Sequence, residues 1–495
     1  MKKLTQWVLT ALLFCYVNML SSCSDSDNFV SPQPEPKNTA QVGTYVWGST
    51  VYGMGTDGAV RLAEAYEKAG IKHVVLLVKG EGGTVSYFKN TLSGAPKART
   101  DRDVLAETIS AMHERGIKVY AWLMVGKDGE WLKNHPTQAS YHFRLGYSDA
   151  VVDLTKLEYQ TYMSKIVKEI EQNYAIDGFA FDMARFQGAY FGWDESDYKR
   201  LTAAKADGGY GVTLEQYNEL VTLLCKEFGY PSSPNAEGRL VYDASADAPQ
   251  KESGALYSAY KPEVPGVYAF GKMREKIVDD ICEFLDSQTD KPTHVASMAE
   301  CTDAPVYGTI AYGMTYNQKY TFDVVCPMLY AADYDKDALW VANNINYLKN
   351  LGYQKILPSL QAYRSANTES LAAYVKAAIE TGCAGYLLFR TGTYDMARPV
   401  RKNNSVELAY VRGTDSTCGN LAVTVSGATP TDVAMSGKLT GTQYKINGQT
   451  ITFSGDALER IGDCGIITIQ CQNDAQPTAV TVASDARIVY NAPME

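Results

Sequence analysis

Two acidic residues, Asp182 and Glu300, each close an apolar segment of the chain. The run from Ile176 to Phe186 reads Ile-Asp-Gly-Phe-Ala-Phe-Asp-Met-Ala-Arg-Phe, and a later segment ends in Ser-Met-Ala-Glu at Glu300. Burying a carboxylate without a partner costs on the order of several kcal/mol, so a carboxylate at such a position is expected to have a structural or functional role. Hydrolysis of an acetal needs one carboxyl group to protonate the leaving oxygen and another to stabilise or attack the carbon. We expect Asp182 to act as nucleophile or base and Glu300 as general acid.

A purely structural role is the alternative for each of these residues. Asp182 can form a buried ion pair with Arg185 or cap a helix, and Glu300 can equally serve the fold. The sequence alone leaves both alternatives open.

Polar and aromatic side chains stand at the ends of the other apolar segments as well. Aromatic faces beside hydrogen-bonding groups suit a pyranose, which has apolar C–H faces and a polar rim. A single such residue is more often part of a core, so the convergence of several at one end is the stronger indication. The expected substrate-binding side chains at these ends are Trp47, Lys79, Trp122, Tyr330, Asp333, Gln361 and Arg390.

Eight short segments rich in β-branched and aromatic residues recur between about residues 44 and 390. Between them, apolar residues recur three and four positions apart, as Tyr159, Met163 and Ile166 do, which predicts amphipathic helices. Apolar strands alternating with such helices predict an α/β fold with a parallel sheet, and eight units favour a closed (β/α)8 TIM barrel. We place the barrel at residues 42–405, with an insertion at about 205–265 that walls a cleft.

The C-terminal stretch, residues 411–495, has a different pattern. Short segments alternate at period two between Gly, Asn and Asp turns, which predicts a small all-β, sandwich-like domain. The stretch has no Trp and few other large aromatic residues. We therefore favour a spacer over a carbohydrate-binding module.

The N-terminus has the pattern of an export signal. A basic start and an apolar run lead to Cys23, which predicts a signal peptide over residues 1–22 whose end resembles a lipobox. An ordinary signal peptide with a chance cysteine is the alternative. Residues 23–41 are rich in Ser, Asp and Pro and predict a flexible tether. We expect an exported protein lipidated at Cys23 and anchored at the outer membrane or cell surface, with the periplasmic face as the other placement.

Charge and cysteine usage restrict the classes of partner. The formal net charge of -10 and the pI near 5.2 argue against a nucleic-acid partner. The 10 cysteines include no CxxC pair and no His/Cys cluster at metal-ligand spacing. We expect a carbohydrate partner and no metal or other cofactor.

The motif around the fourth apolar segment resembles the glycosyl-hydrolase-like family ten and its glycosidase relatives. The matching residues are Val-Asp-Leu-Thr at 152–155 and Asn-Tyr-Ala-Ile-Asp-Gly-Phe-Ala-Phe-Asp at 173–182, followed by Arg185. The resemblance implies a hydrolase of glycosidic bonds on a barrel spanning roughly residues 42 to 400. It also implies that Asp177, Asp182 and Arg185 are signature positions, with Asp177 and Arg185 binding substrate. Met183 and Ala184 depart from the family pattern, which carries an aromatic or acidic residue after the second aspartate.

A more distant likeness to the chitinase family opens an alternative function. Ala184 stands where that family has its catalytic glutamate, so chitinase chemistry of that type lacks its acid. Either another carboxylate pair works, or the protein is a non-catalytic, surface glycan-binding lipoprotein. A different hydrolase on the same barrel, such as a deacetylase, is the third hypothesis, although many of those enzymes need a metal-ligand cluster.

Overall fold

The computed structural model describes residues 41–315, 320–362 and 368–389, and in the C-terminal region 394–399, 407–412, 421–426, 429–435, 444–453, 464–472 and 478–484. The predicted signal peptide (residues 1–22), Cys23 and the tether up to residue 40 lie outside the described residues, as does Arg390. Gln41, expected to end the tether, is the first residue of a strand. In the described ranges, no helix has the length and apolar character needed to cross a membrane.

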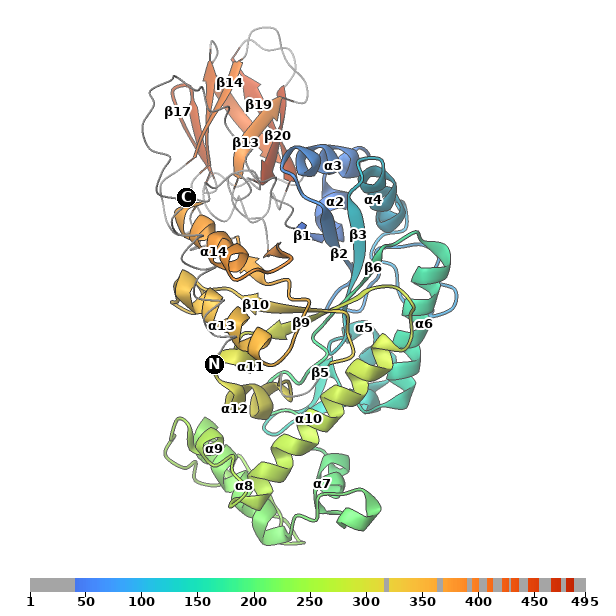
Figure 1. The fold of residues 1–495 in the computed structure, drawn as a ribbon, viewed down its shortest axis with the longest axis vertical. Coiled ribbons are helices and arrows are strands. Elements are labelled where there is room, and N and C mark those ends of the chain that lie inside the picture. Colours follow the sequence, from blue (N-terminus) through green and yellow to red (C-terminus); the bar gives the residue numbers. More distant parts are fainter. Residues whose placement is uncertain are drawn as a thin grey trace, which may run out of the picture. The chain divides into compact units, whose positions relative to one another are not determined.

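Eight parallel strands close into a barrel, which confirms the predicted fold class (Figure 1). The hydrogen-bonded order is β1-β12-β11-β10-β9-β6-β3-β2, so each barrel strand lies beside the one before it along the chain. The carboxyl ends of all the strands therefore gather at one mouth. The strands are β1 (Gln41–Trp47), β2 (His73–Lys79), β3 (Lys118–Met124), β6 (Gly178–Asp182), β9 (Thr293–Met298), β10 (Val324–Leu329), β11 (Ser359–Gln361) and β12 (Gly385–Phe389).

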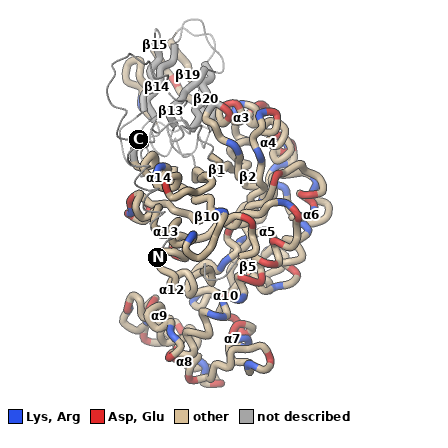
Figure 2. Tube along the Cα trace, in the orientation of Figure 1, with Lys and Arg blue, Asp and Glu red and all other residues tan. Residues whose placement is uncertain are grey.

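Amphipathic helices connect these strands. In α6, residues Tyr159, Met163, Ile166 and Ile170 form the buried face, at the spacing that the sequence showed. Acidic and basic residues are interspersed along the helices (Figure 2). The longer helices are α3 (Gly58–Lys68), α4 (Val104–His113), α6 (Leu157–Asn173), α10 (Pro265–Asp286), α13 (Ala338–Asn350) and α14 (Thr368–Glu380). The short ones are α2 (Gly48–Gly53), α5 (Gly129–Asn134), α11 (Glu300–Asp303), α12 (Pro305–Tyr307) and a π-helical turn, Gly308–Tyr312.

The amino end of the barrel is plugged by side chains. The rings of Tyr120 and His294 stack with their centroids 4.3 Å apart, and His73 packs against both. Burial lowers the pKa of His73 to about 4, so this imidazole is neutral and adds no buried charge. Gly43 has to be glycine, because a Cβ there would lie 2.3 Å from Nε2 of His73. The amino end is therefore closed, and a site that is open to a ligand can lie only at the carboxyl end of the barrel.

The chain between β6 and α10 forms the insertion. It contains α7 (Glu195–Thr202), α8 (Leu214–Phe228), β7 (Ser232–Pro234), β8 (Leu240–Tyr242) and α9 (Ala255–Ser258). The predicted bounds, about 205–265, leave out α7, which already lies beyond the barrel strand. A hairpin of β4 (Ala139–His142) and β5 (Gly146–Val152), between β3 and α6, was not predicted. β4 has only 4 residues, and β5, with 7, lacks the apolar run of a barrel strand because only its last two residues are buried.

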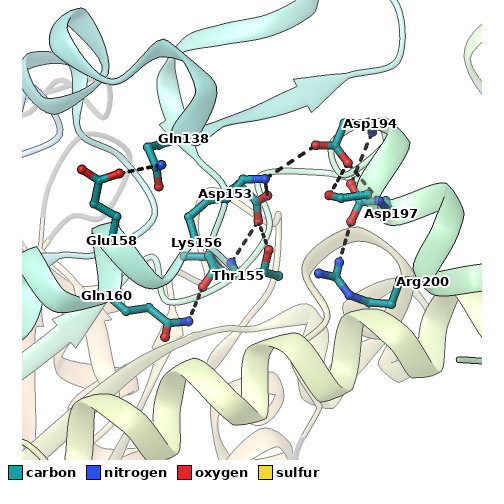
Figure 3. A network of polar contacts seen from close by, with 11 residues as sticks. Gln138, Asp153, Thr155, Lys156, Glu158, Gln160, Asp194, Asp197 and Arg200 are labelled. Atoms are coloured by element: carbon teal, nitrogen blue, oxygen red, sulfur yellow. Dashed lines mark hydrogen bonds and ion pairs between the residues drawn. The ribbon is translucent and has the colours of Figure 1, made fainter. Parts of the chain in front are cut away.

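A network of charged groups joins the insertion to the start of α6 (Figure 3). Nζ of Lys156 lies 3.1 Å from Oδ2 of Asp153 and 3.9 Å from Oδ2 of Asp194. Asp194 caps α7, because its Oδ1 accepts a hydrogen bond from the backbone N–H of Asp197 at 2.9 Å. Arg200 holds Asp197 from the other side, at 3.0 Å. Burial, followed by the charges of Asp153 and Asp194, raises the pKa of Asp197 to about 7. These contacts fix the start of α7 relative to α6.

The C-terminal strands form two antiparallel sheets of four strands each among the described residues, ordered β13-β20-β19-β16 and β14-β15-β18-β17. β13 pairs with β20 and therefore belongs to these sheets, so the all-β region begins at Tyr394 rather than at residue 411. The strands are β13 (Tyr394–Pro399), β14 (Glu407–Arg412), β15 (Leu421–Ser426), β16 (Pro430–Met435), β17 (Tyr444–Asn447), β18 (Thr450–Phe453), β19 (Cys464–Cys471) and β20 (Thr478–Ser484).

Candidate active site

Asp182 is the last residue of β6 and lies at the carboxyl end of the barrel. Its Oδ1 accepts a hydrogen bond from the backbone N–H of Met183 at 2.6 Å, and its Oδ2 accepts one from Nε1 of Trp122 at 3.3 Å. Met183 has a φ of 55°, a left-handed conformation that is uncommon for a residue with a side chain. The strand therefore turns sharply directly after the carboxylate, and two donors hold that carboxylate in one orientation.

Burial raises the pKa of Asp182, because removal from water disfavours the charged form. The Arg185 guanidinium and the two N–H donors act in the opposite direction, and the Glu81 carboxylate adds to the rise. Only 7% of Asp182 is exposed to solvent. The protonated form of Asp182 therefore persists to higher pH than that of an ordinary aspartate.

Glu300 lies in the first turn of α11, two residues after β9, and not at the end of a strand as expected. Its Oε2 accepts a hydrogen bond from the hydroxyl of Tyr334 at 2.9 Å. Tyr334 follows β10, and β10 is hydrogen-bonded to β9, which precedes Glu300. The contact therefore joins the segments that follow two neighbouring strands.

Arg185 links the surroundings of the two carboxylates. Burial raises the pKa of Asp182, and the Arg185 charge lowers it. Burial and the Glu300 charge raise the pKa of the Tyr334 hydroxyl, and the Arg185 charge lowers that pKa as well. The guanidinium lies 5.3 Å from the centre of the Tyr312 ring. Within the described residues, the buried Nε of Arg185 has no hydrogen-bond acceptor. This nitrogen is closed to solvent, so Arg185 acts on the site through its charge.

Aromatic rings line the mouth beside Asp182. The Trp47 ring lies 5.6 Å from that of Trp122 and 5.8 Å from that of Phe389, and Tyr330 stacks on Phe389 at 4.8 Å. Trp122 is 1% exposed and therefore positions Asp182 through its N–H, whereas Trp47 and Tyr330 are half-buried. The predicted aromatic residues thus come together, and Phe389 joins them.

Asp333 and Gln361 also come together, after β10 and at the end of β11. Nε2 of Gln361 donates to Oδ1 of Asp333 at 2.8 Å, and the backbone N–H of Asp333 donates to Oε1 of Gln361 at 3.0 Å. This double contact holds both groups rigidly at the mouth.

Lys79 does not share this environment. Its side chain is fully buried, and its Nζ lies 3.0 Å from Oδ2 of Asp128 and donates to the carbonyl oxygens of Met124 and Lys127 at 2.9 and 3.1 Å. A side chain without accessible surface has no face for a substrate. The structure therefore assigns Lys79 to the packing below the mouth and corrects the expected binding role.

Asp177 lies at the other end of β6 from Asp182. Its Oδ2 accepts a hydrogen bond from the backbone N–H of Val119 at 2.8 Å and lies 2.9 Å from Nε2 of His113. Both partners belong to the amino end of the barrel. The signature aspartates thus lie at opposite ends of β6, and only Asp182 lies at the carboxyl end. The structure corrects the expected binding role of Asp177.

Three residues of the mouth escaped the predicted set of binding side chains. Phe389 ends β12, a strand that the sequence pattern located. Tyr334 stands a few residues beyond β10, and Tyr312 lies in the π-helical turn, for which the sequence offers no clear signal. Within the described part of the chain, no three His, Cys, Asp or Glu side chains group in a way that could hold a metal ion.

Comparison with known proteins gives distant similarities. No family model matches the chain. An S-layer-related protein from Niallia circulans is 25% identical in a match 222 residues long, and the match covers 38% of this chain and 13% of that protein. The chain thus spans only a small part of the length of that relative.

Several solved structures resemble the chain, and they are glycoside hydrolases. The PgaB (BpsB) glycoside hydrolase domain from Bordetella bronchiseptica has a TM-score of 0.48 and 14% identity, covering 71% of this chain and 94% of that chain. The catalytic domain of β-amylase from Paenibacillus polymyxa has a TM-score of 0.49 and 11% identity, covering 71% and 92%. The strand order described above, and not these similarities, defines the fold of this chain.

The buried ion pair of Lys79 leads to a prediction about stability. Lys79→Met leaves Asp128 buried and unpaired, so we expect unfolding to become easier by about 3–5 kcal/mol. Lys127→Met is the control, because Lys127 pairs with the half-exposed Glu81 at 2.8 Å and should cost below about 1 kcal/mol. Chemical denaturation measures both variants. Equal stability losses, or a Lys79 variant with intact stability and weakened substrate binding, would contradict the structural role.

Proposed function

We propose that the chain hydrolyses glycosidic bonds of a poly- or oligosaccharide with Asp182 and Glu300. One observation carries the proposal: the charge of the buried Arg185 acts both on Asp182, at the end of β6, and on Tyr334. The Tyr334 hydroxyl donates to Glu300, which follows the neighbouring strand β9. Acetal hydrolysis needs a pair of carboxyl groups, with one group neutral and one ionised.

The environments favour Asp182 as the general acid and Glu300 as the base or nucleophile. Burial raises the pKa of Asp182, so its protonated form persists to higher pH than that of an ordinary aspartate. The Tyr334 hydroxyl donates to Oε2 of Glu300 and fixes the orientation of that carboxyl group. This assignment reverses the roles expected from the sequence.

The remaining groups of the mouth suit a sugar. Trp47 and Tyr330 offer half-buried aromatic faces, and the exposed Asp333 offers a carboxylate that the buried Gln361 holds in place. A glycan-binding lipoprotein without catalysis is the second candidate, favoured by the low exposure of Asp182 and by its two hydrogen bonds.

We also propose that the protein is exported and anchored through a lipid on Cys23 at the outer membrane or cell surface. The apolar run before Cys23 and the tether after it support this placement. The relative described as S-layer-related is in keeping with a cell-surface role.

Substitution of the two carboxyl groups separates the two candidate functions. We expect Asp182→Asn and Glu300→Gln each to lower kcat on a natural glycan at least about 100-fold, the range of general acid–base catalysis, while glycan binding persists. Asp323→Asn, the same change at the amino end of the barrel, should leave turnover unchanged. Unaltered turnover in Asp182→Asn would rule out the proposed pair.

Substrates with different leaving groups distinguish the acid from the base. The dinitrophenolate of a dinitrophenyl glycoside leaves without being protonated. The variant that lacks the acid should therefore still hydrolyse this substrate. We expect Asp182→Asn to retain this activity and Glu300→Gln to lose it. The opposite pattern would restore the roles expected from the sequence.

The charges around Asp182 predict two opposite shifts in the pH profile of kcat/KM. The alkaline limb reports the pKa of the acid in the free enzyme. Arg185→Gln removes a charge that lowers the pKa of Asp182, so the limb should move to higher pH; Glu81→Gln removes one that raises it, so the limb should move to lower pH. Shifts in the same direction would show that Asp182 does not set this limb.

Lipidation is tested by metabolic labelling with a radioactive fatty acid in Gram-negative host cells. We expect the wild type and Cys15→Ser to carry the label and to sediment with membranes. Cys23→Ser should lose both properties, because Cys23 provides the acceptor thiol. A labelled Cys23→Ser variant, or an unlabelled wild type, would refute the anchor.

A further inference from the structure

A pocket of about 390 Å³ lies between the β4–β5 hairpin and the insertion, apart from the residues of the candidate active site. This volume is in the range of small-molecule sites in proteins. Aromatic side chains dominate its walls, and charged groups stand among them. The lining residues from the hairpin are Tyr141, Phe143 and Tyr147, and those from the insertion are Trp193, Asp194, Glu195, Tyr217, Arg239, Leu240, Val241 and Tyr242.

Both walls of the pocket leave the carboxyl end of the barrel. The hairpin belongs to the connection after β3, and the segment with Trp193 belongs to the connection after β6, which ends in Asp182. Strands β3 and β6 are hydrogen-bonded neighbours. The backbone N–H groups of Gly192 and Trp193 donate to the carbonyl oxygen of Tyr141, at 3.0 and 3.3 Å, and join the walls. The pocket therefore lies on the same side of the barrel as Asp182.

The aromatic walls combine a rigid back with an open face. Phe143 and Trp193 are buried, with ring centroids 5.4 Å apart. Tyr147 is 59% exposed, and its ring lies 5.0 Å from that of Tyr141 at an angle of 89°. Tyr242 is half-buried beside Phe143. An exposed tyrosine beside aromatic rings that are already fixed offers a stacking face, and little side-chain entropy is lost when a ligand binds to it.

The polar groups of the pocket are held in place. Nη1 of Arg239 lies 2.7 Å from Oε2 of Glu195, and the Arg239 guanidinium lies 4.4 Å from the centre of the Tyr198 ring. The charge network of Lys156 and Asp197 fixes Asp194 (Figure 3). The lining thus contains two carboxylates and one guanidinium, which disfavours an anionic ligand.

We propose that this pocket is a second glycan-binding site, which takes one or two pyranose units of a neutral glycan chain. Aromatic faces meet the C–H faces of the sugar, and Glu195 and Arg239 meet its hydroxyl groups. The site holds a polymer beside the mouth at which Asp182 acts. The inference rests on the proposed function only in its choice of glycans as ligands, because binding here requires no hydrolysis.

The test measures binding of the full chain, as wild type and in the Asp182→Asn background, to soluble glucan, mannan, xylan and galactan and to anionic polygalacturonate. Affinity electrophoresis provides the dissociation constants. We expect Tyr147→Ala and Tyr242→Ala to weaken binding to a neutral polysaccharide about tenfold. Leu145→Ala is the matched control, because Leu145 is 73% exposed in the same hairpin and does not line the pocket. Turnover of a short aryl glycoside, which fills only the mouth, should be equal in all pocket variants.

The outcomes separate this inference from the proposed function. Equal binding by Tyr147→Ala and Leu145→Ala, binding of none of the neutral polysaccharides, or a preference for polygalacturonate would each overturn the pocket proposal. If binding depends on Tyr147 but the wild type shows no turnover, the pocket proposal is supported and the proposed hydrolase function is refuted. If Asp182→Asn loses turnover but Tyr147→Ala binds as the wild type does, the hydrolase function is supported and the pocket proposal is refuted.

Discussion

Closure of the eight-stranded parallel sheet is the constraint on which the candidate site depends. Parallel strands in a closed ring bring all their carboxyl ends to one mouth and all their amino ends to the other. The amino end is plugged by the rings of Tyr120 and His294. Asp182 and Glu300, distant along the chain, follow the carboxyl ends of β6 and β9, which are hydrogen-bonded neighbours. The long connections after β3 and β6 then have to leave from the same side, where they enclose the second pocket.

Compensation of buried charge shapes the surroundings of the mouth. Lys79 has Asp128 as its partner, and the buried Arg274 donates to the carbonyl oxygens of Phe191, Gly188 and Ala311. The contacts of these charges stabilise connections within the protein. Asp182 differs, because burial outweighs its donors and raises its pKa. A carboxyl group with a raised pKa beside an arginine, at the open end of a barrel, is an arrangement suited to chemistry.

The barrel was predictable because its strands are buried on both faces, which leaves near-continuous apolar runs in the sequence. The eight segments that recur between about residues 44 and 390 correspond to the eight strands of the barrel, from β1 to β12. The structure moved Glu300 from a strand end into the turn of α11, since β9 stops at Met298. It also separated Asp177 from Asp182, because the two flank the same strand and therefore lie at its opposite ends.

By itself, the sequence determined the α/β class, the strand count and the position of Asp182, since local patterns of apolar residues carry this information. Only the tertiary structure decided which residues at strand ends keep exposed surface and which are buried with a partner inside the protein. Lys79 and Trp47 both end strands, yet Lys79 is enclosed with Asp128 while Trp47 keeps part of its surface. The pairing of Tyr334 with Glu300 was equally hidden. Burial and partners are set by contacts between segments far apart along the chain, and a local pattern does not record those contacts.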